Sequence, residues 1–327
     1  MLDRIKSNPF FPIVTTHSVT SQGISLESFM NDSELLSQVF LDYQQKVGYD
    51  CFPIMEDSTF TAEAFGCKIG FKEREAFVTE PLSFSSEEEI ESYNIPRPEN
   101  YRRIQLILEA VKYVSRYASK ERPVIANSTA PLTSAAKIMG MENLLKKMVR
   151  EPRLITKLLD KVTEFIISFT DALLEAGADI IFVADPIASA DVISPQMFRR
   201  FVFPQLNRLI RGIHRPTILH ICGNIYPIVH DMIETGPTML SIDHCVSIKK
   251  VRKMVGKDII LGGNLDPGEV LFEKTPQQVT DESWRCFREG GRENFILMPG
   301  CTIIPDTPVE NIRAMMKVAK EAASLWG

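Results

Sequence analysis

Short runs of apolar and β-branched residues alternate with amphipathic helical patterns along most of this chain. Eight runs have the length and composition of strands. They lie at 12–19, 51–55, 124–128, 179–184, 217–222, 239–243, 258–262 and 295–298. Helical patterns between them include 31–47, 101–119, 151–176, 194–213, 224–235, 276–289 and 308–324. Eight strands followed by helices in 327 residues predict an α/β fold, a single (β/α)8 TIM barrel spanning 1–327 as one domain.

The spacing of the strands breaks once, at 57–121, which is too long for one crossover. The pattern at 59–81 predicts a β-hairpin that turns near Ile69 and Gly70, followed by an acidic helix start at 85–89. We therefore predict an insertion between strands 2 and 3, near the barrel mouth. Two interpretations stay open: a cover for a substrate, or a solvated decoration without a role.

Composition limits the partners that the chain can bind. A net charge of −5 without a long basic run argues against a nucleic-acid surface, which needs clustered Lys and Arg. The pattern shows neither a signal peptide nor an apolar run of about 20 residues, so we expect a soluble, cytoplasmic protein. Its six scattered cysteines are then reduced, which favours metal binding over disulfides. The expected partner is a small molecule or another protein.

The segment 217–224 (TILHICGN) places an imidazole and a thiol two residues apart in a predicted strand. Residues i and i+2 of a strand point to the same face, so His220 and Cys222 can bind one metal ion. A third soft ligand, Cys301, follows the last predicted strand. One His and two Cys leave the fourth position of a tetrahedral zinc site open, which is typical of catalytic rather than structural zinc.

A different interpretation of these residues is a satisfied core histidine beside an inert thiol. Their places in the predicted barrel favour the metal site, because active sites of such barrels lie at the carboxyl ends of the strands. His220 and Cys222 end the fifth predicted strand, and Cys301 follows the eighth. Asp243 and His244 end the sixth. Residues far apart in sequence are thus predicted to converge on one mouth.

Other polar residues end predicted strands on the same face. Asp185 follows the fourth strand, Asn264 and Asp266 follow the seventh, and His17 ends the first. We predict that they bind or orient the substrate, or support the metal ligands. The alternative is structural: Asp185 and Asp266, each followed by proline, cap a turn or a helix start, and His17 is a core histidine.

Six motifs of the chain resemble those of a known family. They are 62–67 (AEAFGC), 184–186 (ADP), 193–198 (ISPQMF), 220–224 (HICGN), 263–267 (GNLDP) and 299–301 (PGC). They are similar to the uroporphyrinogen decarboxylase-like barrels, and among these to the zinc-dependent, corrinoid-linked methyltransferases. That group includes methylcobalamin:coenzyme M methyltransferases and methyltransferase components of O-demethylases. The resemblance implies Zn2+ on His220, Cys222 and Cys301, and a corrinoid protein that carries methylcobalamin or cob(I)alamin.

The chain departs from the family pattern in two places. The decarboxylases carry an arginine-rich motif on the first strand, whereas 11–19 (FPIVTTHSV) holds no arginine. An octacarboxylate substrate needs several cations, so porphyrinogen decarboxylation is disfavoured. Related zinc enzymes carry a glutamate 23 or 24 residues after the metal-binding histidine. At those positions after His220, this chain has Asp243 and His244. Either of them is a candidate fourth ligand.

Three functions follow from these observations. The first is a zinc-dependent methyltransferase that moves a methyl group between a small molecule and a corrinoid protein. A methyl ether such as a methoxylated aromatic is the favoured donor, and a thiol acceptor is the alternative. Two thiolates cancel the charge of Zn2+, which disfavours hydrolysis but still allows a sulfur or oxygen atom to bind. The other functions are a metal-free decarboxylase and a non-catalytic binding barrel.

Overall fold

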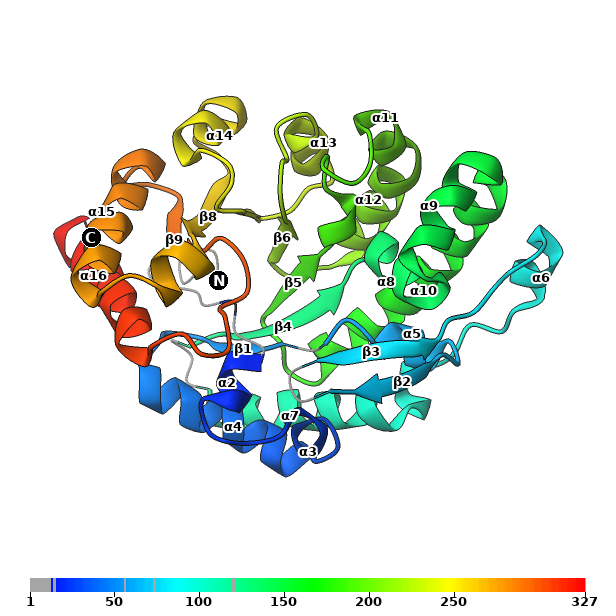
Figure 1. Ribbon diagram of the computed structural model, residues 1–327, viewed down its shortest axis with the longest axis horizontal. Helices are drawn as coiled ribbons and strands as arrows, with labels where there is room; N and C mark the ends of the chain where they lie inside the picture. Colours follow the sequence, from blue (N-terminus) through cyan, green and yellow to red (C-terminus); the bar gives the residue numbers. More distant parts are fainter. Residues whose placement is uncertain (1–12, 14–15, 56, 73–74, 119–121, 327) are drawn as a thin grey trace.

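Seven parallel strands form one curled sheet in the computed structural model, which describes residues 13, 16–55, 57–72, 75–118 and 122–326 (Figure 1). The order β1-β4-β5-β6-β7-β8-β9 follows the chain, so each strand adds beside the previous one. This is the arrangement of a TIM-barrel-like α/β fold. The strands are β1 (Phe52–Ile54), β4 (Val124–Thr129), β5 (Ile180–Ala184), β6 (Thr217–Ile221), β7 (Met239–Ile242), β8 (Ile260–Leu265) and β9 (Phe295–Pro299).

Helices connect the strands and cover the outside of the sheet (Figure 1). Several predicted helices are confirmed: α4 (Ser33–Val47), α7 (Arg102–Tyr117), α10 (Pro152–Glu175), α15 (Pro276–Gly290) and α16 (Val309–Trp326). The predicted helix 194–213 is formed by α11 (Pro195–Met197), the π-helical turn η3 (Phe198–Val202) and α12 (Phe203–Gly212). The remaining helices of the barrel are α8 (Pro131–Met139), α9 (Met141–Arg150), η2 (Pro186–Ala188), α13 (Val229–Glu234), α14 (Ile248–Val255) and η4 (Pro267–Phe272).

The core of the molecule lies on both faces of this sheet. Every residue of β6 and of β9 is buried. Parallel strands that are covered on both faces appear in a sequence as continuous apolar runs, which is why their positions could be predicted. Across the described residues, no helix is both long enough and apolar enough to span a lipid bilayer.

The first predicted strand, 12–19, is wrong where the structure describes it. Residues 12, 14 and 15 lie outside the described residues, and Thr16–Thr20 form the helix α2. Contacts with distant segments hold this helix: the ring of His17 is bonded to Tyr43 of α4 and to the carbonyl of Thr307. Tertiary contacts thus override the strand propensity of a β-branched run. Ile13 accepts a hydrogen bond from Ile303, just beyond β9.

The segment predicted as an insertion contains an antiparallel pair of strands, β2 (Lys68–Phe71) and β3 (Ala76–Glu80). The predicted turn near Ile69 and Gly70 is wrong, because both residues lie inside β2. A Cβ atom on Gly70 would lie 2.8 Å from the Thr79 side chain, so this glycine permits close packing rather than a turn. The other elements of this segment are α5 (Phe60–Ala64), α6 (Glu87–Ser92) and η1 (Pro98–Asn100). The short helix α3 (Leu26–Phe29) lies earlier in the chain, between α2 and α4.

One predicted helix start is confirmed here, and two predicted boundaries need correction. The predicted acidic helix start is confirmed, since Ser86 caps α6 by accepting a hydrogen bond from the Glu89 amide. The predicted helix 224–235 begins later, with Val229 as the first residue of α13. The predicted strand 258–262 is shifted, so Asn264 lies inside β8 rather than after it. Boundaries of this kind depend on hydrogen bonds that residue patterns do not specify.

Candidate metal centre

The end of β6 positions the first two members of the candidate metal site. His220 lies in β6, and Cys222 follows its last residue. As expected for i and i+2 of a strand, their side chains share a face, and His220 Nε2 lies 3.1 Å from Cys222 Sγ. His220 is 4% exposed, whereas Cys222 is partly accessible. The pair therefore stands between the buried core and the barrel mouth.

Cys301, just beyond β9, completes the group. Its Sγ atom lies 3.7 Å from Cys222 Sγ, and the three donor atoms all lie within 4.8 Å of one another. Gly300 allows this approach, because a Cβ atom at that position would overlap the backbone of His244. Among the residues that the structure describes, these three are the one group of His, Cys, Asp or Glu side chains spaced closely enough for a metal ion. We call them the triad.

A neighbouring strand orients the imidazole of the triad. His220 Nδ1 lies 3.2 Å from the carbonyl oxygen of Ser241 and 3.0 Å from its hydroxyl. A carbonyl only accepts, so Nδ1 carries the proton and the lone pair of Nε2 faces the sulfur atoms. Phe182 stacks on the other side of the ring, with centroids 5.8 Å apart. The ring is therefore held in the tautomer and orientation that a metal ligand needs.

The two thiols of the triad share a hydrogen bond. That bond lowers the pKa of Cys301 to about 4. The same bond, together with burial, raises the pKa of Cys222. The shared hydrogen bond therefore favours the ionised form of Cys301, and the thiolate is the form of cysteine that binds metal ions.

Asp243 and His244, the candidate fourth ligands, lie beside the triad with other partners. Asp243 Oδ2 accepts a hydrogen bond from the Gly223 amide at 2.9 Å, and Oδ1 accepts one from the Cys245 amide at 3.0 Å. His244 Nδ1 lies 2.8 Å from Asp243 Oδ1. Asp243 thus fixes the turn that follows Cys222. The structure does not bring either residue into the triad.

Asp185 lies at the carboxyl end of β5, where its amide donates to the His220 carbonyl at 2.9 Å. Its Oδ1 atom accepts hydrogen bonds from the amide and hydroxyl of Thr133, at 2.9 and 2.6 Å, in the first turn of α8. Asp185 therefore binds the first turn of α8, whereas its side chain makes no cap hydrogen bond to η2, the helix that it precedes. Its Oδ2 atom is buried without a hydrogen-bond partner in the structure. Burial raises the pKa of this carboxyl to about 6, against the opposing hydrogen bonds of Thr133.

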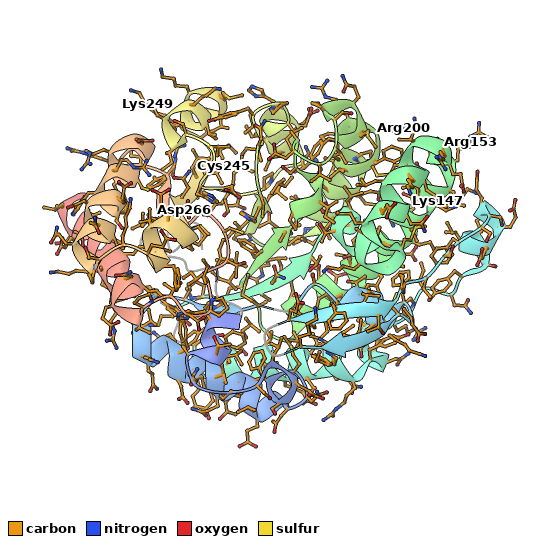
Figure 2. The ribbon with its side chains drawn as sticks, in the orientation of Figure 1. Lys147, Arg153, Arg200, Cys245, Lys249 and Asp266 are labelled. Atoms are coloured by element: carbon orange, nitrogen blue, oxygen red, sulfur yellow. The ribbon has the colours of Figure 1, made fainter. Side chains whose placement is uncertain are left out.

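Asp266 and Asn264 hold the loops beside Cys301. Asp266 caps η4, because its Oδ1 accepts from the amides of Gly268 and Glu269 at 2.7 and 2.9 Å. Asn264 is buried, and its side chain donates to the carbonyls of Asp243 and Val246 at 2.9 and 2.7 Å. Both residues therefore shape the mouth from the strands that flank it. Figure 2 shows Asp266 and Cys245 inward of the outer helices on the left side of the view.

His17 is not brought near the triad by any contact of its side chain. It is fully buried, and Nε2 donates to the Thr307 carbonyl at 2.8 Å. Nδ1 therefore accepts the hydrogen bond of the Tyr43 hydroxyl at 2.6 Å. Burial lowers the pKa of this ring, so it is neutral. Both nitrogen atoms are occupied, as in a structural core histidine.

The sequence did not reveal three residues that support the site. Ser241 is the register partner of His220 on the neighbouring strand, so an alignment of β6 with β7 could have found it. Asp191 Oδ2 accepts a hydrogen bond from the Asn224 amide at 2.7 Å. Thr133 binds Asp185 from α8, which no sequence pattern connects with that residue. For the last two no sequence signal existed, because loop packing sets both contacts.

Comparison with known proteins places this geometry in a family. The model for uroporphyrinogen decarboxylase (URO-D) matches residues 11–322, and the chain belongs to that family. A methylcobamide:CoM methyltransferase, MtaA of Methanosarcina barkeri, is 30% identical over 292 residues, covering 88% of this chain and 84% of the relative. A uroporphyrinogen decarboxylase of a Wolbachia strain from Drosophila simulans is 28% identical over 317 residues, covering 90% and 87%.

The fold has a solved counterpart among the methyltransferases. A methyltransferase from Methanosarcina mazei matches with a TM-score of 0.88 and 27% identity, covering 96% of this chain and 94% of that one. The resemblance predicted from the sequence motifs is therefore confirmed, both for the family and for its similarity to the methyltransferases.

Proposed function

We propose that this protein is a methyltransferase that moves a methyl group between a small molecule and a corrinoid protein, with zinc held by His220, Cys222 and Cys301. The observation that carries the proposal is the geometry of the triad at the carboxyl ends of the strands. The names of the M. barkeri relative and of the M. mazei structure support it. The methylcobalamin or cob(I)alamin would belong to the partner protein.

The donor atoms of the triad fit zinc. Tetrahedral zinc with Zn–S near 2.3 Å and Zn–N near 2.05 Å separates two sulfur ligands by about 3.8 Å, and a nitrogen from a sulfur by about 3.6 Å. The distance between the two Sγ atoms is 3.7 Å, and that from His220 Nε2 to Cys222 Sγ is 3.1 Å. The first agrees, and the second needs a shift of only about 0.5 Å.

Bound zinc would supply a Lewis acid for the sulfur or oxygen atom of the molecule that gives or receives the methyl group. The protein's own residues prepare that position. Ser241 keeps the lone pair of His220 Nε2 toward the sulfur atoms, and Asp243 holds the turn after Cys222. Asp243 accepts from two backbone amides, and the His244 ring lies against the carboxylates of Asp243 and Asp266. We therefore propose that the substrate takes the fourth position.

The direction of transfer defines the substrate. With a methyl ether as donor, the bond between methyl and oxygen breaks, the phenolate or alkoxide leaves, and cob(I)alamin becomes methylcobalamin. With a thiol as acceptor, the thiolate takes the methyl and cob(I)alamin is released. We favour the ether. Cobalamin spectroscopy distinguishes the two, since the first consumes cob(I)alamin and the second forms it.

We also propose that the insertion 57–121 covers one side of the mouth, and that Asp185, Asn264 and Asp266 orient the site through the loops that they hold. Contacts between the insertion and α8 support the first part. The Leu82 amide donates to the Ile138 carbonyl at 2.7 Å, and Cys67 Sγ donates to the same carbonyl at 3.5 Å. Helix α8 begins directly after β4, at the carboxyl end of the sheet.

The test of the metal site is its zinc content. Purified wild type is expected to hold about one zinc per chain, and Cys222→Ala and Cys301→Ala are expected to lose most of it while keeping the barrel fold. Cys245→Ala is the matched control, because that thiol lies beside Asp243 but outside the triad. Full zinc retention in both triad variants would refute the assignment. Circular dichroism verifies that the variants are folded.

A decarboxylase is the second candidate, since uroporphyrinogen decarboxylases are also relatives. It predicts release of CO2 from a carboxylated substrate without bound metal. The Cys301→Ala variant separates the two functions. A methyltransferase should lose both its zinc and its methyl transfer to or from a corrinoid in this variant. CO2 release that persists in this variant would favour the decarboxylase.

A further inference from the structure

The two strands beside His220 present different side chains to its ring. In a parallel sheet, residues paired in register point to the same face, and neighbouring strands lie about 4.8 Å apart. Ser241 is the register partner of His220 on β7, and its hydroxyl lies 3.0 Å from the imidazole Nδ1. Ala184 is the register partner on β5. A methyl group therefore lies on the side of the imidazole opposite Ser241.

Ala184 is the accessible member of its strand. The other four residues of β5 are buried, whereas Ala184 is partly exposed. The next residue, Asp185, turns its carboxylate to the Thr133 hydroxyl in α8, at 2.6 Å, on the helix side of the sheet. Side chains alternate along a strand, so the Ala184 methyl points into the barrel. Solvent thus reaches the inner face of the sheet beside the imidazole of the triad.

Ala184, Phe182 and Thr129 together form what we call the alanine side of the site. Phe182, two residues before Ala184, stacks on the imidazole of the triad with centroids 5.8 Å apart and is 1% exposed. Thr129 on β4 is the register partner of Ala184. Ser128 turns outward, since its hydroxyl lies 3.4 Å from that of Thr170 in α10, so Thr129 points inward. The alanine side therefore has an aromatic ring beneath it and small side chains around it.

The other sides of the triad carry longer groups that already have partners. Asp243, after β7, accepts from two backbone amides, and Asn264 of β8 donates to two backbone carbonyls. Cys301 brings the second sulfur atom from beyond β9. Strands β5 and β4 contribute only the methyl of Ala184 and the short side chain of Thr129 to the same face. A metal ion on the triad would therefore have its open position toward the alanine side.

We infer that the molecule bound to the metal extends over the alanine side, and that Ala184 sets the size of the group that this molecule carries. The inference rests on the proposed function, because the metal on the triad would define where the reacting sulfur or oxygen atom binds. Beyond that atom, the molecule lies against the Ala184 methyl, one layer above Phe182, which favours a flat apolar group such as an aryl ring. The insertion approaches from the same side, through the bond of the Leu82 amide to the Ile138 carbonyl in α8, the helix after β4.

Two thiols of different bulk test this inference. 2-Mercaptoethanol carries a slender chain, and benzenethiol carries a ring directly on its sulfur atom. Calorimetric titration of the zinc-loaded wild type, corrected for thiol pKa, should show that both bind. Ala184→Val adds two methyl groups where the wild type is accessible, and it should weaken the binding of benzenethiol at least about tenfold more than that of 2-mercaptoethanol. Its zinc content should equal that of the wild type, because the triad is unchanged.

Two further variants serve as controls. Ala184→Ser changes the chemistry of the position with little change in its size, so both thiols should bind as they do to the wild type. Val192→Leu enlarges a side chain in the loop after β5, where Val192 is 41% exposed, and should weaken neither thiol. Circular dichroism verifies that each variant is folded.

The wild type itself provides a second measurement. Carbon-13 labelling of alanine methyl groups makes the Ala184 signal visible by NMR, and the Ala184→Ser variant identifies it because the signal is missing there. Benzenethiol should shift this signal through the ring current of its aryl group, whereas 2-mercaptoethanol should not. An unshifted Ala184 signal in the protein saturated with benzenethiol would overturn the inference without any need for the valine variant.

The outcomes separate this inference from the proposed function. A wild type that binds neither zinc nor thiol would overturn the proposed function. A zinc-loaded Ala184→Val variant that binds benzenethiol as tightly as the wild type would overturn the inference alone, and so would an equal weakening by Val192→Leu. Loss of zinc from folded Ala184→Val would also overturn it, because Ala184 would then act on the metal site rather than on the bound molecule. So would a zinc-loaded wild type that binds 2-mercaptoethanol but not benzenethiol.

Discussion

The buried carboxyl of Asp185 makes the stability of the fold depend on pH in a direction that can be worked out. Its folded-state pKa is about 6, above the ordinary value of 3.8, because burial penalises the charged form. A raised carboxyl pKa contributes stability that is fully present below 3.8 and is lost as pH rises through about 6. At neutral pH the native protein therefore holds an unfavourable buried charge.

The substitution Asp185→Asn removes this charge and keeps an oxygen that accepts from Thr133. The shift from 3.8 to about 6 corresponds to about 3 kcal/mol at neutral pH. At about pH 4.5 the same relation leaves only about 1 kcal/mol, because the folded carboxyl is then protonated. With an unfolding entropy of about 0.7 kcal/mol/K for 327 residues, the melting temperature should rise by about 4 °C at neutral pH and by about 1.5 °C at pH 4.5.

Thermal unfolding followed by circular dichroism at both pH values measures this difference. The exposed Asp258→Asn variant is the control and should change the melting temperature equally at the two pH values. A gain for Asp185→Asn that is the same at both, or larger in acid, would refute the idea that a buried charge is the cause. Loss of stability at neutral pH would show that Asp185 has a stabilising partner as a carboxylate.

Three other changes test named contacts. Gly300→Ala should cost about 1–3 kcal/mol in unfolding free energy and weaken zinc binding, because the added methyl meets the His244 backbone; melting temperature and zinc titration measure both. Burial lowers the pKa of His17, so the unfolding free energy that its neutral ring contributes is present above the ordinary pKa of 6.5 and is lost as pH falls. His17→Gln should therefore reduce the loss of stability in acid, measured by urea unfolding. Arg103→Met should cost about 3–5 kcal/mol in the same assay by leaving Asp57 without its buried partner, and a neutral result would contradict that role.

The parts of this fold that depend on hydrophobic periodicity could be predicted from the sequence. The buried strands from β4 to β9 could be located because parallel strands covered on both faces form continuous apolar runs. His220 and Cys222 could be placed on one face because strand geometry fixes i and i+2. Cys301 joined them through the rule that strand ends of a barrel meet at one mouth.

The failures have a common physical origin in contacts between distant segments. The run around His17 has the composition of a strand, but its bonds to Tyr43 and Thr307 hold a helix. Gly70 suggested a turn, whereas it permits packing against Thr79. Asp191 reaches the Asn224 amide through the shape of two loops, and no spacing in the sequence encodes that shape.

The two sulfur atoms of the triad come from positions 79 residues apart, although they lie 3.7 Å from each other. The chain between them contains β7, β8 and β9. An ion bound to both would close this stretch into a loop, much as a crosslink does, and restrict the unfolded chain by about 4.5 kcal/mol in the simplest entropic treatment. A metal ion bound there would then also stabilise the part of the sheet from β7 to β9 against unfolding, so metal supply would affect the lifetime of the folded protein as well as any activity of the site.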